Sequence, residues 1–214
     1  MNELISTKWL YENLNNQNLV IFDCSWFLPS KKINTESEYK KIHIEGSHYF
    51  NIEKISDQKN KFPHMVPNLK NFKNKMKNFN INKKSKIIVY GSENILGPSR
   101  AWWMFRYFGF KNIYLLNGGL RKWIKESKPT TNKKSPTKHS SFNFIIDATW
   151  IKNKEIILKN LKNKNFLIFD ARSNERFKGK EKEPRKGLRA GNIPNSKNIF
   201  WKDLTNQSNK IISK

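Results

Sequence analysis

Short apolar segments alternate with amphipathic ones along the first half of the chain. Three segments of five or six residues are apolar through their middle, which is typical of parallel strands buried on both faces. From Leu69 to Phe79, apolar side chains instead recur every three or four residues, which predicts a helix with one buried face. A second helix is predicted over Ser99–Phe108, after a loop that contains glycine and proline. Strands that alternate with helices predict an α/β fold in which helices flank a parallel sheet. The three predicted strands are residues 18–23, 86–90 and 112–116.

The pattern then repeats after a polar interruption. Residues 127–141 contain no apolar side chain and two prolines, which predicts a linker. Beyond it, residues 165–170 (NFLIFD) resemble residues 18–23 (NLVIFD), and the two final aspartates are 170 − 23 = 147 residues apart. Ile44 and Ile193 lie in two further similar stretches and are 193 − 44 = 149 residues apart. Two anchors with nearly one spacing indicate a tandem duplication.

The duplication predicts the domain organisation. We expect a complete copy over residues 1–126, a linker over 127–141 and an incomplete second copy over 142–214. The loop that begins at Gly91 would recur at about residue 240 with this spacing. The second copy is therefore expected to lack that loop.

The composition restricts the possible classes of function. The 214 residues carry a formal charge of +25 and include a single cysteine. No apolar run is long enough to span a bilayer, and the first residues do not resemble a secretory signal. One cysteine cannot build a disulfide framework or a multi-cysteine zinc site, so we expect no metal, no cofactor and a reducing compartment, the cytoplasm.

The arginines carry more information than the lysines. Lysines are scattered along the chain, in loops and in predicted helices alike, which indicates a solvated surface rather than a specific nucleic-acid interface. Arg100, Arg106 and Arg121 are expected to form buried pairs with Asp or Glu, a task that suits a guanidinium better than an ammonium. The other four lie in a polar loop with glycine and proline and are better candidates for a binding site. They are Arg172, Arg176, Arg185 and Arg189.

Several motifs of aromatic, glycine and charged residues punctuate the chain. In the first half they are Asp23-Cys24-Ser25-Trp26, His43-Ile44-Glu45-Gly46, Pro63-His64-Met65-Val66-Pro67, Ser99-Arg100-Ala101-Trp102-Trp103-Met104-Phe105-Arg106 and Asn117-Gly118-Gly119-Leu120-Arg121. In the second half they are Asp170-Ala171-Arg172-Ser173, Arg176-Phe177-Lys178-Gly179, Glu183-Pro184-Arg185 and Gly191-Asn192-Ile193-Pro194. Together they resemble the tandem-domain sulfurtransferases: the rhodaneses and, more closely, the 3-mercaptopyruvate sulfurtransferases. The resemblance covers nearly the whole chain and implies a rhodanese-like fold.

The resemblance also implies an activity. Such enzymes move sulfane sulfur from 3-mercaptopyruvate or thiosulfate to a thiol or cyanide through a cysteine persulfide. The thiolate sits in a loop between a strand and a helix, where backbone N–H groups and the helix N-terminus stabilise an anionic sulfur. In the family this cysteine belongs to the second copy. The catalytic residue is therefore expected beyond Lys214, and none is expected in the chain.

Two residues could be considered as replacements. Cys24 lies among Phe22, Trp26 and Phe27 and is predicted to be a small buried side chain. Ser92 lies in the corresponding loop of the first copy, but no base is evident near it in the sequence, and serine is a poor sulfur carrier. We assign neither as the nucleophile.

The resemblance implies roles for binding and supporting residues. Arg176 and Arg185 would hold the carboxylate and carbonyl oxygens of mercaptopyruvate, whose coplanar oxygens suit guanidinium groups. Arg172 is expected to pair within its own domain. His64 would act with the catalytic residues across the domain interface, and Glu53 occupies the position of the family's usual Asp. A histidine paired with a carboxylate is oriented for proton transfer.

The other histidines are given no functional role. His43 is expected to be structural, and His48 and His139 are interpreted as surface residues. Asn192 replaces the family's histidine in the second copy.

The sequence thus predicts a sulfurtransferase homologue that is inactive alone. Its partners would be a small-molecule sulfur donor, a thiol acceptor and a complementing C-terminal segment with the missing cysteine, and no membrane or specific nucleic acid. The alternative is a non-catalytic binding module on the same scaffold, which would hold small anions or a protein partner.

Overall fold

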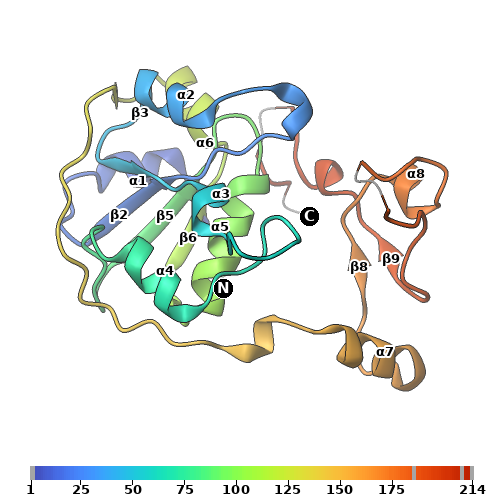
Figure 1. Ribbon diagram of the computed structural model, residues 1–214. Helices are drawn as coiled ribbons and strands as arrows, with labels where there is room; N and C mark the ends of the chain where they lie inside the picture. Colours follow the sequence, from blue (N-terminus) through green and yellow to red (C-terminus); the bar gives the residue numbers. More distant parts are fainter. Residues whose placement is uncertain (1–2, 185–186, 208–209, 213–214) are drawn as a thin grey trace. The chain divides into compact units, whose positions relative to one another are not determined.

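The computed structural model describes residues 3–184, 187–207 and 210–212, which fall into two units (Figure 1). The first unit contains the chain up to Trp150 together with Lys210, and the second contains residues 151–207, 211 and 212. The helices of the first unit are α1 (Thr7–Glu12), α2 (Thr35–Lys41), α3 (Ile52–Ile55), α4 (Leu69–Met76), α5 (Leu96–Tyr107) and α6 (Gly119–Lys125), with 3-10 turns η1 (Pro29–Lys31) and η2 (Ala148–Trp150).

A five-stranded parallel sheet forms the centre of the first unit, with the strand order β1-β6-β5-β2-β4. Its two longest strands, β2 and β5, pair from Leu19 with Lys86 to Asp23 with Tyr90, so they end at the same edge. The chain leaves β2 toward β4 and returns on the other side of β2 as β5, a change of direction at which open α/β sheets form crevices. The strands are β1 (Leu4–Ile5), β2 (Leu19–Asp23), β4 (Ser47–Tyr49), β5 (Lys86–Tyr90) and β6 (Ile113–Leu116).

Alternate side chains of the strands face two separate apolar cores. Val20 and Phe22 of β2 pack in one core with residues of α3, α4 and α5. Ile21, between them, packs in the other core with residues of α1 and α6. This alternation is what a strand buried on both faces requires. The predicted α/β fold, a parallel sheet flanked by helices, is confirmed. The helix predicted from Ser99 begins earlier, at Leu96, where the side chain of Asn94 accepts the Leu96 N–H at 2.9 Å.

The predicted linker packs on the first unit. Its residues Thr130–Thr131 form strand β7, which pairs antiparallel with β3 (His43–Ile44). The Ser135 hydroxyl donates to the Ser47 carbonyl at 2.7 Å, and Phe144 is fully buried in the core beside α4. These contacts place residues 130–150 with the first unit, and the predicted division into a complete and an incomplete copy stays a prediction.

The second unit is small, and its described residues bury little of their surface. Its elements are α7 (Lys154–Asn163), β8 (Phe169–Asp170), α8 (Asn174–Phe177), β9 (Lys197–Asn198) and the 3-10 turn η3 (Trp201–Leu204), and β8 pairs parallel with β9. Within the described part of this unit, the only buried residue is Asn160, whose side-chain amide exchanges two hydrogen bonds with the backbone of Phe166. Leu167 and Phe169 are more than half exposed. No helix in the described ranges of either unit combines the length and apolarity needed to cross a membrane.

Candidate functional site

Two residues from different elements meet at the surface of the first unit. Glu53 lies in α3, and His64 lies in the loop that leads to α4. Nε2 of His64 is 2.8 Å from each carboxylate oxygen of Glu53. The Trp26 indole donates its Nε1–H to the same carboxylate at 2.7 Å, and its ring meets the His64 ring edge-on at 5.3 Å. The His–carboxylate contact expected between these two residues is therefore formed.

The chemistry of this pair follows from what each group can donate. A carboxylate accepts hydrogen bonds only, so Nε2 of His64 carries the proton in this contact. In the neutral ring, Nδ1 is then the nitrogen that can take up a further proton. The His64 side chain is 25% exposed and that of Glu53 is 58% exposed, so the pair is open to solvent. The arrangement can hold a proton and exchange it with a group brought to this surface.

The single thiol cannot take part in surface chemistry. Cys24 follows β2 and is fully buried, and its Sγ donates to the Phe22 carbonyl at 3.7 Å. Burial, with the nearby Asp23 carboxylate, raises the pKa of the Cys24 thiol well above its ordinary value. The predicted small buried side chain is confirmed. A thiol that stays protonated and out of reach of solvent is neither a nucleophile nor a sulfur carrier.

The polar groups of the loop after β5 form hydrogen bonds with the residues that follow β2. The Ser92 N–H donates to the Ser25 hydroxyl at 2.9 Å, and the Asn94 side chain donates to the Trp26 carbonyl at 3.0 Å. At Gly97, a Cβ atom would lie 1.8 Å from the Cys24 carbonyl oxygen, so only glycine fits. The loop is thus closed against the end of β2.

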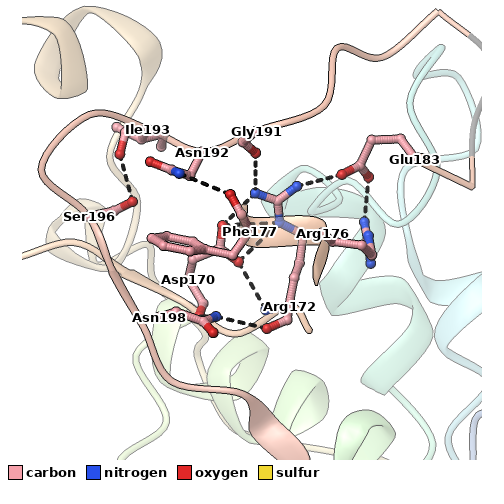
Figure 2. Close-up of polar contacts among 10 residues, drawn as sticks. All are labelled: Asp170, Arg172, Arg176, Phe177, Glu183, Gly191, Asn192, Ile193, Ser196 and Asn198. Atoms are coloured by element: carbon pink, nitrogen blue, oxygen red, sulfur yellow. Dashed lines mark hydrogen bonds and ion pairs between the residues drawn. The ribbon is translucent and has the colours of Figure 1, made fainter. Parts of the chain in front are cut away.

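The second unit contains a network of two arginines and two carboxylates, shown in Figure 2. Arg172 donates to both oxygens of Asp170, with Nε 3.0 Å from each, and to Glu183 at 2.6 Å. Arg176 donates to the other oxygen of Glu183. The Glu183 side chain is only 5% exposed, and the hydrogen bond from Arg176 lowers the pKa of its carboxyl. Glu183 therefore fixes both guanidinium groups.

One predicted arginine is oriented by this network and one is outside the described residues. Nε of Arg176 is buried and has no hydrogen-bond partner among the described residues. A buried donor of this kind is uncommon and is satisfied when a ligand oxygen reaches it. Arg185 lies outside the described residues. Arg172 pairs within its own unit, as predicted.

Two sequence predictions about charged residues are wrong. Arg100 was expected to pair with a carboxylate, but its Nη2 donates to the His64 carbonyl and its guanidinium stacks on Trp103 at 4.4 Å. His48 was expected at the surface, but it is half-buried against Phe79, and burial lowers its pKa to about 4. In both cases an aromatic side chain supplies part of the environment, Trp103 three residues along the same helix for Arg100 and the distant Phe79 for His48.

The other two histidine predictions are confirmed, since His139 is exposed and His43 is structural, and two residues were missed. His43 is buried, with its ring nitrogens near the carbonyls of Tyr39 and Lys133, so it is structural. Sequence reasoning gave no role to Trp26 or Glu183. Both lie in the motifs described above, so the motifs were the only signal that could have found them.

The first unit is thus an α/β domain whose parallel sheet is covered on both faces, and it carries a histidine–carboxylate pair on its surface. Comparison with known proteins gives the class. The rhodanese-like domain model matches residues 6–126. The 3-mercaptopyruvate sulfurtransferase of Mus musculus is 35% identical over 211 residues, which are 95% of this chain and 71% of the mouse protein. The thiosulfate sulfurtransferase of Cricetulus griseus is 34% identical over 210 residues, 94% of this chain and 70% of that protein.

Solved structures agree with these relatives. The crystal structure of SseA from Escherichia coli, described as a 3-mercaptopyruvate sulfotransferase with the rhodanese fold, superposes with a TM-score of 0.89 at 27% identity. It is matched over 100% of this chain and 80% of that chain. Tum1 from Saccharomyces cerevisiae superposes with a TM-score of 0.86 at 28% identity. The chain therefore belongs to the sulfurtransferase family of rhodanese-fold proteins.

Proposed function

We propose that these residues form part of a sulfurtransferase that moves sulfane sulfur from 3-mercaptopyruvate or thiosulfate to a thiol or to cyanide. In this proposal, the cysteine that carries the sulfur is not one of the 214 residues of this chain. Support comes from relatives of both names at 33–35% identity, and from a fold match that spans the whole chain.

The observation that carries this proposal is the burial of Cys24. The chain holds one thiol, and that thiol is fully buried with a raised pKa. With mercaptopyruvate, the catalytic thiolate attacks the donor's sulfur. An S–S bond forms and the C–S bond breaks, and the bonding electrons leave on carbon as the enolate of pyruvate. Because Cys24 cannot become this thiolate, the nucleophile has to be supplied by other residues.

The residues present fit the supporting roles. The departing enolate needs one proton, and His64, held by Glu53, is a surface group that holds and releases protons. Arg176, which Glu183 orients, and Arg185 bind the carboxylate and keto oxygens of the donor. The acceptor thiol then attacks the outer sulfur of the persulfide and regenerates the thiolate. A lone reduced cysteine favours action in a reducing compartment such as the cytoplasm.

The test is an assay with mercaptopyruvate and cyanide, with thiocyanate as the product. The 214-residue chain is expected to show no turnover alone. It is expected to gain turnover when it is expressed with a segment from a family member that carries a Cys-Gly-Ser-Gly-type loop. His64→Gln and Arg176→Lys should each lower the complemented rate. Full turnover by the chain alone, abolished by Cys24→Ala, would overturn the proposal.

The second candidate is a non-catalytic module that binds small anions or a protein partner. The observation in its favour is that the Arg172–Glu183–Arg176 network is fully assembled in residues that contain no usable thiol. This candidate predicts that the chain alone binds pyruvate in a calorimetric titration and that Arg185→Ala abolishes the heat signal. Absence of binding to the chain alone would leave the sulfurtransferase proposal as the better account.

A further inference from the structure

His64 has a backbone conformation that needs external support. Its φ is +61°, in the left-handed region that residues with a Cβ atom rarely adopt. It lies between Pro63 and Met65, in a loop with partly exposed side chains. Residues held in such conformations persist where the surrounding structure fixes them, and they concentrate at functional sites.

The support comes from Arg100 on helix α5. Its Nη2 donates to the His64 carbonyl oxygen, across 36 positions of the sequence. The face of its guanidinium lies over the Trp103 ring, one turn further along the helix, at 4.4 Å. An arginine can donate from its edge while its face stacks on an aromatic ring, and a lysine cannot do both. This dual contact explains an arginine at this position in a chain whose basic residues are mostly lysine.

Helix α5 itself is anchored in the core. Ala101, Met104 and Phe105, which surround Arg100 on the helix, are all fully buried. The contact from Arg100 therefore ties the His64 carbonyl to a helix that is packed into the core of the first unit. From the other side, Trp26 holds the Glu53 carboxylate, which in turn holds Nε2 of His64. His64 is therefore held at its backbone carbonyl by Arg100 and at its ring by Glu53.

We propose that Arg100 is a positioning residue for His64. By holding the His64 carbonyl, it sets the left-handed backbone that directs the imidazole onto Glu53, and it thereby selects the ring form with the proton on Nε2. Nδ1 is then the acceptor that exchanges protons during sulfur transfer. This inference rests on the proposed function, in which His64 is the group that holds and releases a proton.

The test uses the full chain and reads the ring of His64 directly. The ¹⁵N chemical shifts of the two imidazole nitrogens, measured at mildly alkaline pH and assigned with a His64→Asn variant, report which nitrogen carries the proton. In the wild type the Nε2–H form is expected to dominate. In Arg100→Gln and Arg100→Lys, we expect the minor form to rise by about tenfold, the factor that corresponds to loss of one charge-assisted hydrogen bond. Far-UV circular dichroism and the melting temperature establish that each variant is folded.

Arg106→Lys is the matched control. Arg106 lies on the same helix, its guanidinium stands over Trp102 at 5.5 Å, and it donates to the Lys111 carbonyl at 3.2 Å. It has an equivalent aromatic neighbour without a contact to His64, so Arg106→Lys is expected to leave the His64 shifts unchanged. If both Arg100 variants fail to fold, Trp103→Leu removes the stacking surface and should shift the ring in the same direction.

The outcomes are separable from those of the sulfur-transfer assay. Folded Arg100 variants with wild-type His64 shifts would overturn the positioning role, whether or not the complemented chain transfers sulfur. A change in the His64 shifts for Arg100→Gln, with none for Arg106→Lys, supports it even if the complemented chain proves inactive. A change of equal size in the Arg106→Lys control would also overturn it, because the effect would then be a general consequence of altering α5.

Discussion

The ends of β2 and β8 share a backbone arrangement but differ in what surrounds it. Asp23 ends β2 and its side chain accepts the N–H of Ser25 at 2.8 Å; Asp170 ends β8 and accepts the N–H of Arg172 at 2.9 Å. The Asp23 carbonyl accepts a bond from Phe50 in the chain that continues β4. The Asp170 carbonyl accepts one from Ile199, which continues β9. These two regions are the ones that the repeat in the sequence aligns.

Their environments have opposite effects on the carboxyl group. Asp23 is 2% exposed, and burial raises the pKa of its carboxyl. Asp170 is bound by the Arg172 guanidinium, and those hydrogen bonds lower the pKa of its carboxyl. β2 has neighbours on both edges and apolar cores on both faces, whereas β8 pairs with β9 alone among the described residues. The first region is therefore held by apolar packing and the second by ionic contacts.

The comparison shows that the same turn, an aspartate after a parallel strand, can be held in place either by apolar packing or by ionic contacts. An aspartate that caps a turn after a parallel strand needs only a backbone N–H two residues later. The pKa of that aspartate, and therefore whether its carboxyl group stabilises the folded state at a given pH, depends on the residues that other elements pack around it. The following predictions test this contrast.

The largest effect is expected from truncating the aromatic residue before each aspartate. Phe22 is fully buried against Phe50, Phe79 and Phe105, whereas Phe169 is 53% exposed. Phe22→Ala should lower the free energy of unfolding of the first unit by about 3–5 kcal/mol. Phe169→Ala should change that of the second unit by less than about 1 kcal/mol. Urea unfolding, monitored by hydrogen exchange in each unit, measures the two free energies of unfolding. Similar losses in the two variants would show that the two regions are not held by different kinds of contact.

The buried strands were predictable because their signal is local. The segment at 86–90 forms β5 with the predicted bounds, and the segments at 18–23 and 112–116 each lose one polar residue at the start. The predicted strand at 165–170 is shorter, because β8 contains only Phe169 and Asp170. An apolar run specifies a long strand only where neighbouring strands pair with it, and the run itself does not carry that information.

The candidate site was only partly predictable, because its contacts are tertiary. His64 and Glu53 were identified from motifs, and they are 11 positions apart along the chain. The Trp26 contact with Glu53 spans 27 residues and the Arg100 contact with His64 spans 36. Nothing in the local pattern around Arg100 distinguishes a bond to a carbonyl from a bond to a carboxylate. Such contacts depend on how the elements pack against one another, which the spacing of residues along the chain does not reveal.

The next largest effect is expected from Glu183→Gln in the second unit. Glu183 joins Arg172 and Arg176, and it is nearly buried. The substitution leaves two guanidinium groups without their shared carboxylate, so protection from hydrogen exchange over residues 170–183 should fall by about 1.5–3 kcal/mol. Glu181→Gln is the control, because Glu181 is exposed and accepts one bond from Ser173 at 3.2 Å. Equal effects of the two substitutions would show that the network does not hold this unit.

A smaller effect is expected from making the first region resemble the second at one position. Ala171 occupies, after Asp170, the place that Cys24 occupies after Asp23. Cys24→Ala removes one buried sulfur atom and should destabilise the first unit by about 1 kcal/mol.

In the wild type, a thiol reagent should label Cys24 only as fast as the first unit unfolds, and denaturant should accelerate labelling. Rapid labelling of the folded chain would contradict the burial on which the proposed function rests.

The smallest and most specific effect is the pH dependence of the two aspartates, which should appear on opposite sides of their ordinary pKa of 3.8. The folded pKa of Asp23 is raised, so the folded state keeps a proton that the unfolded chain has lost, and stability falls as the pH rises through the window above 3.8. The folded pKa of Asp170 is lowered, so its contribution is present above 3.8 and is lost as the pH falls below that value. Unfolding midpoints from about pH 6 to about pH 3, for the wild type, Asp23→Asn and Asp170→Asn, separate the two windows. Asp23→Asn should abolish the change above 3.8 and Asp170→Asn the change below it. If both substitutions acted in the same window, the different surroundings of the two turns would not control the ionisation of their aspartates.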